Sequence, residues 1–204
     1  MDFGNHSLKN VVIKYIFLPT FNLPNTSMCG RYAFYESWHE FLDEFDLESP
    51  GIKELTPVYN AAPSMELPVI YHHEGKRMAD TLRWGLIPHW SKDEKIGYKM
   101  INARAETIAK KPAFREPFTS QRCLVPASGF FEWRKEGKTK HPYFIRFRDE
   151  SPMFLAGLYD EWTSEEDGEV LTTFTIITID ANAHVTETSR NMTVAYYREI
   201  PPMR

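Results

Sequence analysis

The sequence predicts an α+β fold built on an antiparallel, barrel-like β core with a few short helices. Short runs of β-branched and aromatic residues outnumber helical patterns along the 204 residues. Two pairs of these runs flank a Glu-Gly-Lys triplet, at 74–76 and at 136–138, as the strands of a hairpin flank their turn. Strands and helices do not alternate regularly, so a parallel sheet of βαβ units is not expected.

The first element after residue 30 is predicted to be an amphipathic helix over residues 38–46. Ser37 and Glu40 have the Ser-x-x-Glu spacing of a capping box, in which both side chains bond to N–H groups of the first turn. The apolar residues that follow at helical spacing are Trp38, Phe41, Leu42 and Phe45. We expect this aromatic stripe to face the core.

The remaining predicted elements are mostly strands. The two hairpins pair 67–73 with 78–86 and 130–134 with 143–147, and two further strands cover 154–159 and 171–179. Between the hairpins, residues 105–110 are predicted to form a short helix. Antiparallel strands in this number favour closure into a barrel-like sheet.

Composition predicts a single folded domain that is intracellular. Hydrophobic residues make up 42% of the chain, enough to bury a core, so disorder of the whole chain is excluded. The longest apolar stretch, 11–18, is interrupted by Lys14 and is far shorter than the roughly 20 residues of a membrane-spanning helix. Cys29 and Cys123 can form one disulfide at most, which is typical of a reducing compartment. We expect a cytoplasmic monomer with no membrane partner, associated with the nucleoid in a bacterium.

The charges are strongly segregated along the chain. The net charge is −4, yet residues 76–148 contain 17 Lys and Arg against 7 Asp and Glu, a net of +10. A basic block of this kind is the electrostatic signature of contact with nucleic acid phosphates, although it can also be a solvated face.

Residues 1–27 are interpreted as an extension of the domain that spans residues 28–204. They show no sustained periodicity, and the early Asp2 together with breaks at Lys14 and Pro19 does not match the pattern of a secretory signal. The segment is predicted to be a disordered extension, or upstream sequence ahead of a true start at Met28.

A start at Met28 gives Cys29 unusual chemistry, because removal of an initiator Met leaves Cys29 as the first residue. The α-amine and thiol have reference pKa values of about 8 and about 8.5, so both nucleophiles are available near neutral pH. The amine can condense with an aldehyde and the thiol can then close a thiazolidine ring. The thiolate can instead attack an amide carbonyl with the amine as base. The plain alternative is a small buried cysteine.

Five sequence blocks in order carry a resemblance to a known family. They are MCGR at 28–31, YNAAP at 59–63, WGLIP at 84–88, INARAET at 101–107 and RCLVPASGFFEW at 122–133. Together they resemble the SOS-response-associated peptidase (SRAP) family, whose members shield abasic sites in single-stranded DNA. The resemblance runs from Met28 to about Asn182, roughly three quarters of the chain.

The resemblance implies a catalytic set of Cys29, Asn102 and Glu132. In this family the terminal Cys joins its amine and thiol to the ring-opened aldehyde of an abasic site, which gives a covalent thiazolidine crosslink between DNA and protein. Cys29 matches that nucleophile, and Asn102 matches an Asn that holds the opened sugar. Glu132 matches a Glu that transfers protons and removes an N-terminal extension where one exists, an autopeptidase activity.

The resemblance also implies a DNA-binding set. Arg31 and Arg104 match family arginines that contact phosphate, and Pro63 and Trp84 lie in blocks that shape the DNA-binding cleft. Trp84 and Trp90 could stack on bases or belong to the core, and we expect at least one of them to be core.

The residue types agree with these roles but each has a structural alternative. Glu132 lies between two aromatic residues, and these apolar surroundings predict that the pKa of its carboxyl group is raised to a range suited to proton transfer. It could instead be an outward-facing strand carboxylate, as Asn102 could cap a turn and Arg104 could form a surface ion pair. Cys123 is predicted to be buried and structural.

The C-terminal part departs from the family pattern. Family members carry a catalytic His in an Ile-His-x-Arg-Met-Pro block, and without gaps Ser189 falls at that position. His184 is the nearest histidine, five positions earlier. The chain also stops at Arg204, which suggests a truncated copy with reduced activity.

Two other function classes therefore stay open. One is a non-catalytic binder of single-stranded DNA, a relative that lacks the family His. The other is an amidohydrolase with a terminal nucleophile, since Met-Cys-Gly also opens class II glutamine amidotransferases. No cofactor is expected, and no Cys/His cluster has the spacing of metal ligands, because His72 and His73 fall at a hairpin turn.

Overall fold

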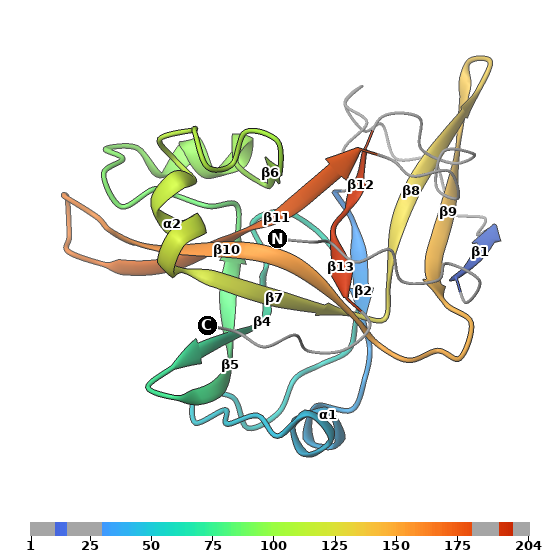
Figure 1. Ribbon diagram of the computed structural model, residues 1–204, viewed down its shortest axis with the longest axis horizontal. Coiled ribbons are helices and arrows are strands. Elements are labelled where there is room, and N and C mark those ends of the chain that lie inside the picture. The colour runs from blue at the N-terminus through green and yellow to red at the C-terminus, as the bar shows by residue number, and fades with distance from the viewer. Residues whose placement is uncertain (1–10, 16–29, 181–191, 198–204) are drawn as a thin grey trace.

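A computed structural model describes residues 11–15, 30–180 and 192–197 of the chain, in the arrangement of Figure 1. The strands are β1 (Val11–Tyr15), β2 (Tyr32–Phe34), β3 (Val58–Ala61), β4 (Glu66–His73), β5 (Lys76–Trp84), β6 (Asn102–Arg104), β7 (Arg122–Ala127), β8 (Gly129–Glu136), β9 (Thr139–Phe147), β10 (Met153–Thr163), β11 (Val170–Asp180), β12 (Met192–Val194) and β13 (Tyr196–Tyr197). The helices are α1 (Trp38–Phe45), α2 (Arg115–Ser120) and the 3₁₀ helix η2 (Glu94–Lys99).

Five of the strands close into a barrel. In order around the barrel they are β11, β5, β4, β7 and β10, and β10 pairs with β11 to complete the ring. Four of these five pairings are antiparallel, and only β5 with β11 is parallel. The predicted α+β fold with a barrel-like, mainly antiparallel core is thus confirmed.

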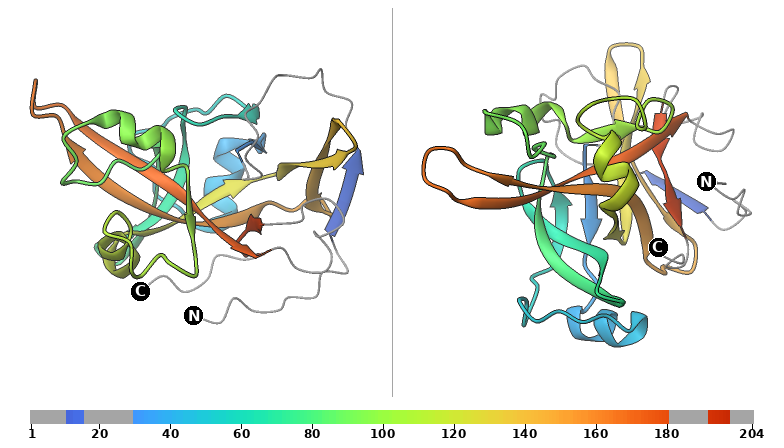
Figure 2. Two further views of the ribbon diagram at one scale, coloured as in Figure 1. Left: turned by 90° about the horizontal axis from the view of Figure 1, so that it is seen from above. Right: turned by 60° about the vertical axis from the view of Figure 1, so that its left-hand side comes forward.

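A second sheet stands beside the barrel. Its order is β1, β9, β8, β2 and β3, and every neighbouring pair is antiparallel. Only Ser128 separates β7 of the barrel from β8 of this sheet, so the chain passes directly from one to the other. Figure 2 shows β8, β9 and β1 extending to one side of the barrel.

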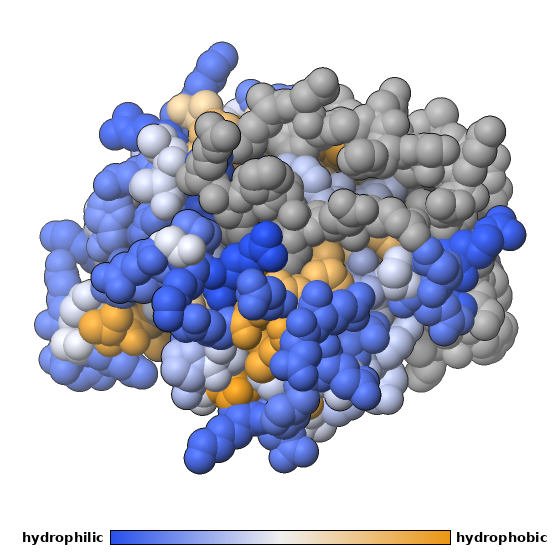
Figure 3. Space-filling model, turned by 60° about the horizontal axis from the view of Figure 1, so that its bottom comes forward, coloured by the Kyte–Doolittle hydropathy of each residue, from blue (hydrophilic) through white to orange (hydrophobic). Residues whose placement is uncertain are grey.

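One large hydrophobic core joins the barrel and the second sheet. It contains Leu67 and Phe174 from the barrel together with Tyr32 and Phe130 from the second sheet, and all four are fully buried. Burial of this apolar surface is the main favourable term for the fold. Among the residues that Figure 3 colours by hydropathy, most are hydrophilic and the apolar ones form small patches.

Both predicted hairpins are confirmed, and each has a two-residue turn. His73 pairs with Lys76 around Glu74 and Gly75, which both have positive φ angles, as a type I′ turn requires. In the second hairpin Glu136 pairs with Thr139.

The helices agree with the prediction only in part. The helix α1 forms where expected, but Ser37 occupies the N-cap position without a side-chain capping bond, so the predicted capping box is wrong. Burial of Trp38 and Phe41 holds the helix instead. Residues 105–110 form successive turns closed by bonds between residues three apart, and the short helix α2 begins only at Arg115. Pro112 disfavours helical geometry at the residue before it, which limits a helix in this segment.

The N-terminal extension differs from its predicted disorder in one segment. Val11–Tyr15 forms β1, which pairs along its whole length with β9. Three β-branched residues in succession favour a strand once a sheet edge is available.

Candidate functional site

Glu132 is a buried carboxyl side chain on β8, and only 3% of it is exposed. Strand β2 pairs with β8 through Tyr32 and Phe130, and the N–H of Phe131 donates to the carbonyl oxygen of Arg31 at 2.9 Å. The chain therefore enters β2 beside the strand that carries this carboxyl group.

Strand alternation fixes the face on which Glu132 lies. Phe130 and Glu132 are two residues apart on β8, so their side chains lie on the same face of the sheet. Phe130 belongs to the core shared with the barrel, whereas Phe131 belongs to a small cluster on the opposite face. Glu132 thus faces the barrel side of the sheet. The outward-facing alternative for this carboxylate is excluded by its burial.

A glycine permits the close packing that places Glu132. A Cβ added at Gly129 would lie 2.7 Å from the carbonyl oxygen of Ile145 on β9 and closer still to the ring of Phe144. Only a residue without a side chain lets the start of β8 approach β9 this closely.

Trp84 links this sheet to the segment that carries Asn102. Its ring is 1% exposed and lies 5.3 Å from the ring of Tyr32, centroid to centroid. Its other neighbour is Phe174, with ring planes 12° apart. The indole N–H donates to the carbonyl oxygen of Ile101 at 2.9 Å, which fixes the residue immediately before Asn102.

Asn102 begins β6, a short strand that runs parallel to β11. It pairs with Ile176, whose N–H donates to the carbonyl oxygen of Ile101 at 3.2 Å. The Oδ1 atom of Asn102, the Oε1 atom of Glu132 and the hydroxyl oxygen of Tyr32 are all fully buried. Three polar side chains from β2, β6 and β8 therefore reach the interior.

The remaining predicted site residues lie around this centre. Arg104 is exposed two residues after Asn102, and Arg31 is half-buried with a guanidinium N–H bonded to the carbonyl oxygen of Gly30 at 3.0 Å. Pro63 is half-buried next to Ser64, whose N–H donates to the carbonyl oxygen of Trp84 at 2.8 Å. The structure thus brings Pro63 and Trp84 together, and the backbone of β6 joins Arg104 to the same region.

The two tryptophans behave differently. Trp84 is core, as expected of at least one of the two, so its buried ring cannot stack on a base. Trp90 is 51% exposed. Cys123 is buried on β7, and burial raises the pKa of its thiol, so its predicted structural role is confirmed.

Tyr32, whose buried hydroxyl lies on the strand next to Glu132, is a candidate site residue that sequence reasoning missed. Its signal was its position two residues after Gly30, in the block that begins at Met28. Cys29, His184 and Ser189 lie outside the described residues.

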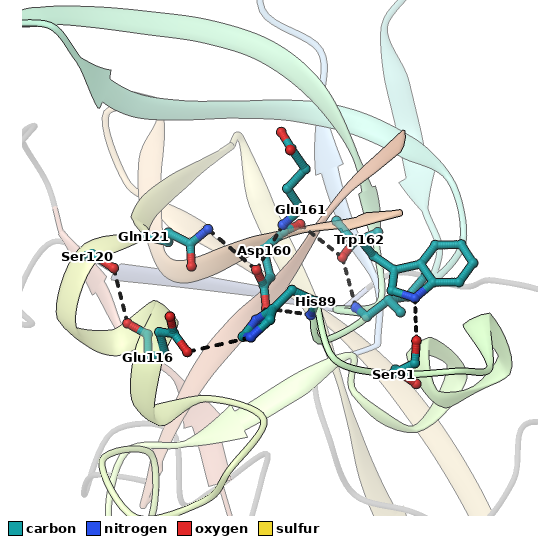
Figure 4. Close-up of polar contacts among 10 residues, drawn as sticks. His89, Ser91, Glu116, Ser120, Gln121, Asp160, Glu161 and Trp162 are labelled. Carbon is teal, nitrogen blue, oxygen red and sulfur yellow. Dashed lines mark hydrogen bonds and ion pairs between the residues drawn. The ribbon is translucent and has the colours of Figure 1, made fainter. Parts of the chain in front are cut away.

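A second polar cluster joins different elements (Figure 4). The buried carboxylate of Asp160 on β10 accepts the backbone N–H of His89 at 3.0 Å and lies 3.2 Å from Nδ1 of the same residue. Nε2 of His89 lies 3.7 Å from Glu116 of α2. The hydroxyl of Ser91 is bonded to the carbonyl oxygen of Asp93, so it is not aimed at the imidazole as a nucleophile would be. This cluster holds the loop after β5 and α2 onto the barrel.

The described part of the chain offers neither a metal site nor a membrane helix. Among these residues no group of three or more His, Cys, Asp or Glu side chains is placed to hold a metal ion. No helix within the described ranges combines the length and apolar character needed to cross a membrane.

Comparison with known proteins gives a consistent result. The family model described as SOS response associated peptidase (SRAP) matches residues 28–199, so β1 precedes the match. The chain is 45% identical over 169 residues to the abasic site processing protein YoaM of Bacillus subtilis, covering 82% of this chain and 74% of that protein. It is 44% identical over 159 residues to the abasic site processing protein YoqW of the same species, covering 76% of this chain and 70% of that protein. A crystal structure of a protein from Bacteroides thetaiotaomicron is similar with a TM-score of 0.77 at 33% identity, covering 82% of this chain and 76% of that one.

Proposed function

This chain belongs to the SOS response associated peptidase (SRAP) family, and on that basis we propose that it processes abasic sites in single-stranded DNA. The names of the Bacillus subtilis relatives state abasic site processing for those proteins. The proposed product is a covalent thiazolidine between Cys29 and the ring-opened sugar, formed by a monomer.

The proposed reaction needs no oxidant or reductant. The α-amine of Cys29 attacks the aldehyde carbon and gives a carbinolamine. Protonated Glu132 donates a proton to the carbinolamine hydroxyl, which leaves as water. The Cys29 thiol then returns a proton to Glu132, and its sulfur adds to the resulting iminium carbon. One C–N and one C–S bond form, and the released water carries the aldehyde oxygen with one amine hydrogen and the thiol hydrogen.

The observation that carries this proposal is the register between β2 and β8. The N–H of Phe131 donates to the carbonyl oxygen of Arg31, so the chain that follows Cys29 lies beside the strand that carries Glu132. Imine formation requires an acid close to the amine, and Glu132 is a buried acid on that strand.

Asn102 and Arg104 are proposed to hold the DNA. The Asn102 side chain donates and accepts hydrogen bonds and is positioned by the Trp84 contact to Ile101, which suits it to the hydroxyl groups of an opened sugar. Arg104 and Arg31 are proposed to contact phosphates, and Pro63 to shape the cleft wall.

In a chain that begins at Met1, this chemistry requires removal of residues 1–28. Before that removal the nitrogen of Cys29 is part of a peptide bond, and an amide nitrogen cannot form an imine. We propose that hydrolysis adds one water across the bond between Met28 and Cys29 and releases the carboxylate of Met28 and the amine of Cys29, with Glu132 moving the proton.

Intact-mass analysis tests the proposal. Chains expressed from Met1 and from Met28 are measured before and after incubation with single-stranded DNA that carries one abasic site. We expect a species that begins at Cys29 and gains the mass of the oligonucleotide less one water.

Variants identify the groups involved. Cys29→Ala should abolish the adduct, and Glu132→Gln should slow it by about a hundredfold, the usual scale for loss of a general acid. Glu161→Gln, which changes an exposed carboxylate on β10, is the matched control and should leave the rate unchanged. Crosslinking by Cys29→Ala would overturn the assignment. Salt-sensitive binding without any adduct would favour the binding-only function, and glutamine hydrolysis would favour the amidohydrolase.

A further inference from the structure

Tyr98 is an exposed aromatic side chain on a turn that is packed against the barrel. It belongs to the 3₁₀ helix η2, and 68% of it is exposed to solvent. The residue before it, Gly97, is buried against Gly85, which follows β5. A Cβ added at either glycine would lie 2.7 Å from the carbonyl oxygen of the other. Only residues without a side chain allow so close an approach of two backbones, so the turn is fixed while the ring of Tyr98 stays outside.

The segment between Tyr98 and Asn102 is also held in place. The carbonyl oxygen of Met100 accepts the N–H of Leu86 at 3.2 Å, and that of the next residue accepts the indole N–H of Trp84 at 2.9 Å. The exposed ring and the candidate sugar-binding residue therefore share one rigid support. A ring on a fixed backbone loses little conformational freedom when a ligand stacks on it.

The surface around Tyr98 carries positive charge. Four cationic side chains are exposed between residues 92 and 104, namely Lys92, Lys95, Lys99 and Arg104. The two acids of this stretch are already engaged, because Asp93 accepts the backbone N–H of Lys95 at 2.9 Å and Glu94 forms an ion pair with Arg83 at 3.3 Å. An exposed aromatic ring among cations is the arrangement that binds single-stranded nucleic acid, whose bases stack and whose phosphates need positive charge.

We propose that Tyr98 is a stacking platform for one base of the single strand that flanks the abasic site, with Lys99 contacting a phosphate. The inference rests on the proposed function and adds to it a requirement for an unpaired base near the lesion. Asn102 follows Tyr98 by four residues, so their Cα atoms lie at most about 14 Å apart. Stacked nucleotides rise about 3.4 Å each, so the platform serves a base within about four nucleotides of the abasic sugar.

A cycle of protein and DNA changes tests the stacking. One oligonucleotide carries a tetrahydrofuran analogue of the abasic site, which has no aldehyde and cannot crosslink. A second has the same backbone but lacks the four bases on each side of the analogue. Tyr98→Leu should weaken binding to the first by about tenfold, the scale of one lost base–aromatic contact, and should not change binding to the second. Equal weakening on both strands, or on neither, would overturn the proposal.

Two further variants separate the ring from the charge. Tyr98→Phe keeps the ring and should bind both strands as the unaltered chain does. Lys99→Ala should lower the slope of log K against log salt by about 0.7, the value for one phosphate contact, whereas Tyr98→Leu should leave the slope unchanged. Weak binding by Tyr98→Phe would overturn the stacking, and an unchanged slope in Lys99→Ala would overturn the phosphate contact. Both positions are exposed, so thermal unfolding should change little.

Adduct formation separates this inference from the proposed function. On a strand with a true abasic site, Tyr98→Leu should raise the DNA concentration for half-maximal rate by about tenfold and leave the maximal rate unchanged, because the ring does not contact the reacting atoms. A lower maximal rate would contradict a role in binding alone. If the unaltered chain forms no adduct while the binding cycle holds, the crosslinking function fails and the platform stands. If the adduct forms and the cycle fails, only the platform is overturned.

Discussion

The indole N–H of Trp84 donates to the carbonyl oxygen of Ile101 across 2.9 Å, and this bond joins two sequence blocks that the chain separates. Trp84 ends a barrel strand and contacts Tyr32 of the second sheet, while Ile101 immediately precedes Asn102. One buried side chain thus sets the position of Asn102 relative to β2, the strand that leads back to Cys29.

Replacement of Trp84 by Phe should separate these two blocks. The change removes a buried hydrogen bond and part of a large ring, so we expect about 2 kcal/mol less stability and at least a tenfold slower crosslinking reaction. Trp162→Phe is the matched control, because the Trp162 indole N–H donates to the carbonyl oxygen of Ser91 at 2.6 Å in a different part of the barrel. Denaturant unfolding measures the stability of each variant, and the rate of adduct formation measures its crosslinking. An equal loss of crosslinking in Trp84→Phe and Trp162→Phe would contradict a specific role for the Trp84 hydrogen bond.

Arg104 should contribute to DNA binding through charge alone. Arg104→Ala should weaken single-strand binding and reduce the slope of log K against log salt by about 0.7, the value for one lost phosphate contact. Lys53→Ala removes an exposed charge next to Ile52, whose carbonyl oxygen accepts the indole N–H of Trp38 in α1. Figure 1 shows α1 at the opposite end of the molecule from β6, so this variant should change neither quantity. Fluorescence anisotropy over a range of salt concentrations measures both. An unchanged slope for Arg104→Ala would contradict a phosphate contact.

Asp160 should matter for stability and not for the reaction. Its carboxylate is buried and accepts the backbone N–H of His89, so Asp160→Ala leaves donors unsatisfied and should cost about 2 to 3 kcal/mol. Glu161→Ala, an exposed neighbour, should cost less than about 0.5 kcal/mol. Thermal unfolding gives the difference. A loss of crosslinking per folded molecule in Asp160→Ala would instead give this cluster a part in the chemistry.

Cys123 should resist thiol reagents in the folded protein. It is fully buried, and burial raises its pKa, so the reactive thiolate is scarce at pH 8. Iodoacetamide at that pH should leave Cys123 unmodified until denaturant is added, as peptide mass mapping would show. Rapid native labelling of Cys123 would mean that the barrel opens locally around β7.

Local sequence chemistry predicted the hairpins and α1 correctly. A turn such as Glu74-Gly75 is set by residues next to it in the chain, because only a few residues adopt positive φ at low cost. The same reasoning failed at residues 105–110, where helix-forming residues were followed by Pro112 and the segment was free to form successive turns.

The sequence alone also identified the family and the residue types of the site, because the five blocks occur in order along the chain. It could not choose between Trp84 and Trp90 as the core residue, since Trp84 ends β5 and Trp90 follows it closely, and they differ in what the fold places against them. The sequence could not predict closure of the barrel either. It depends on the parallel pairing of β5 with β11, in which Phe174 lies opposite Trp84 although the two are far apart in the chain.

What the sequence determined is therefore the chemistry: a cysteine that can become terminal, an acid in apolar surroundings and a basic central block. What only the tertiary structure decided is which of these groups meet. The alignment of Glu132 with Tyr143 and of Phe130 with Tyr32 comes from strand register, and register between distant strands is set by burial of one face of the sheet against the barrel, which no local pattern encodes.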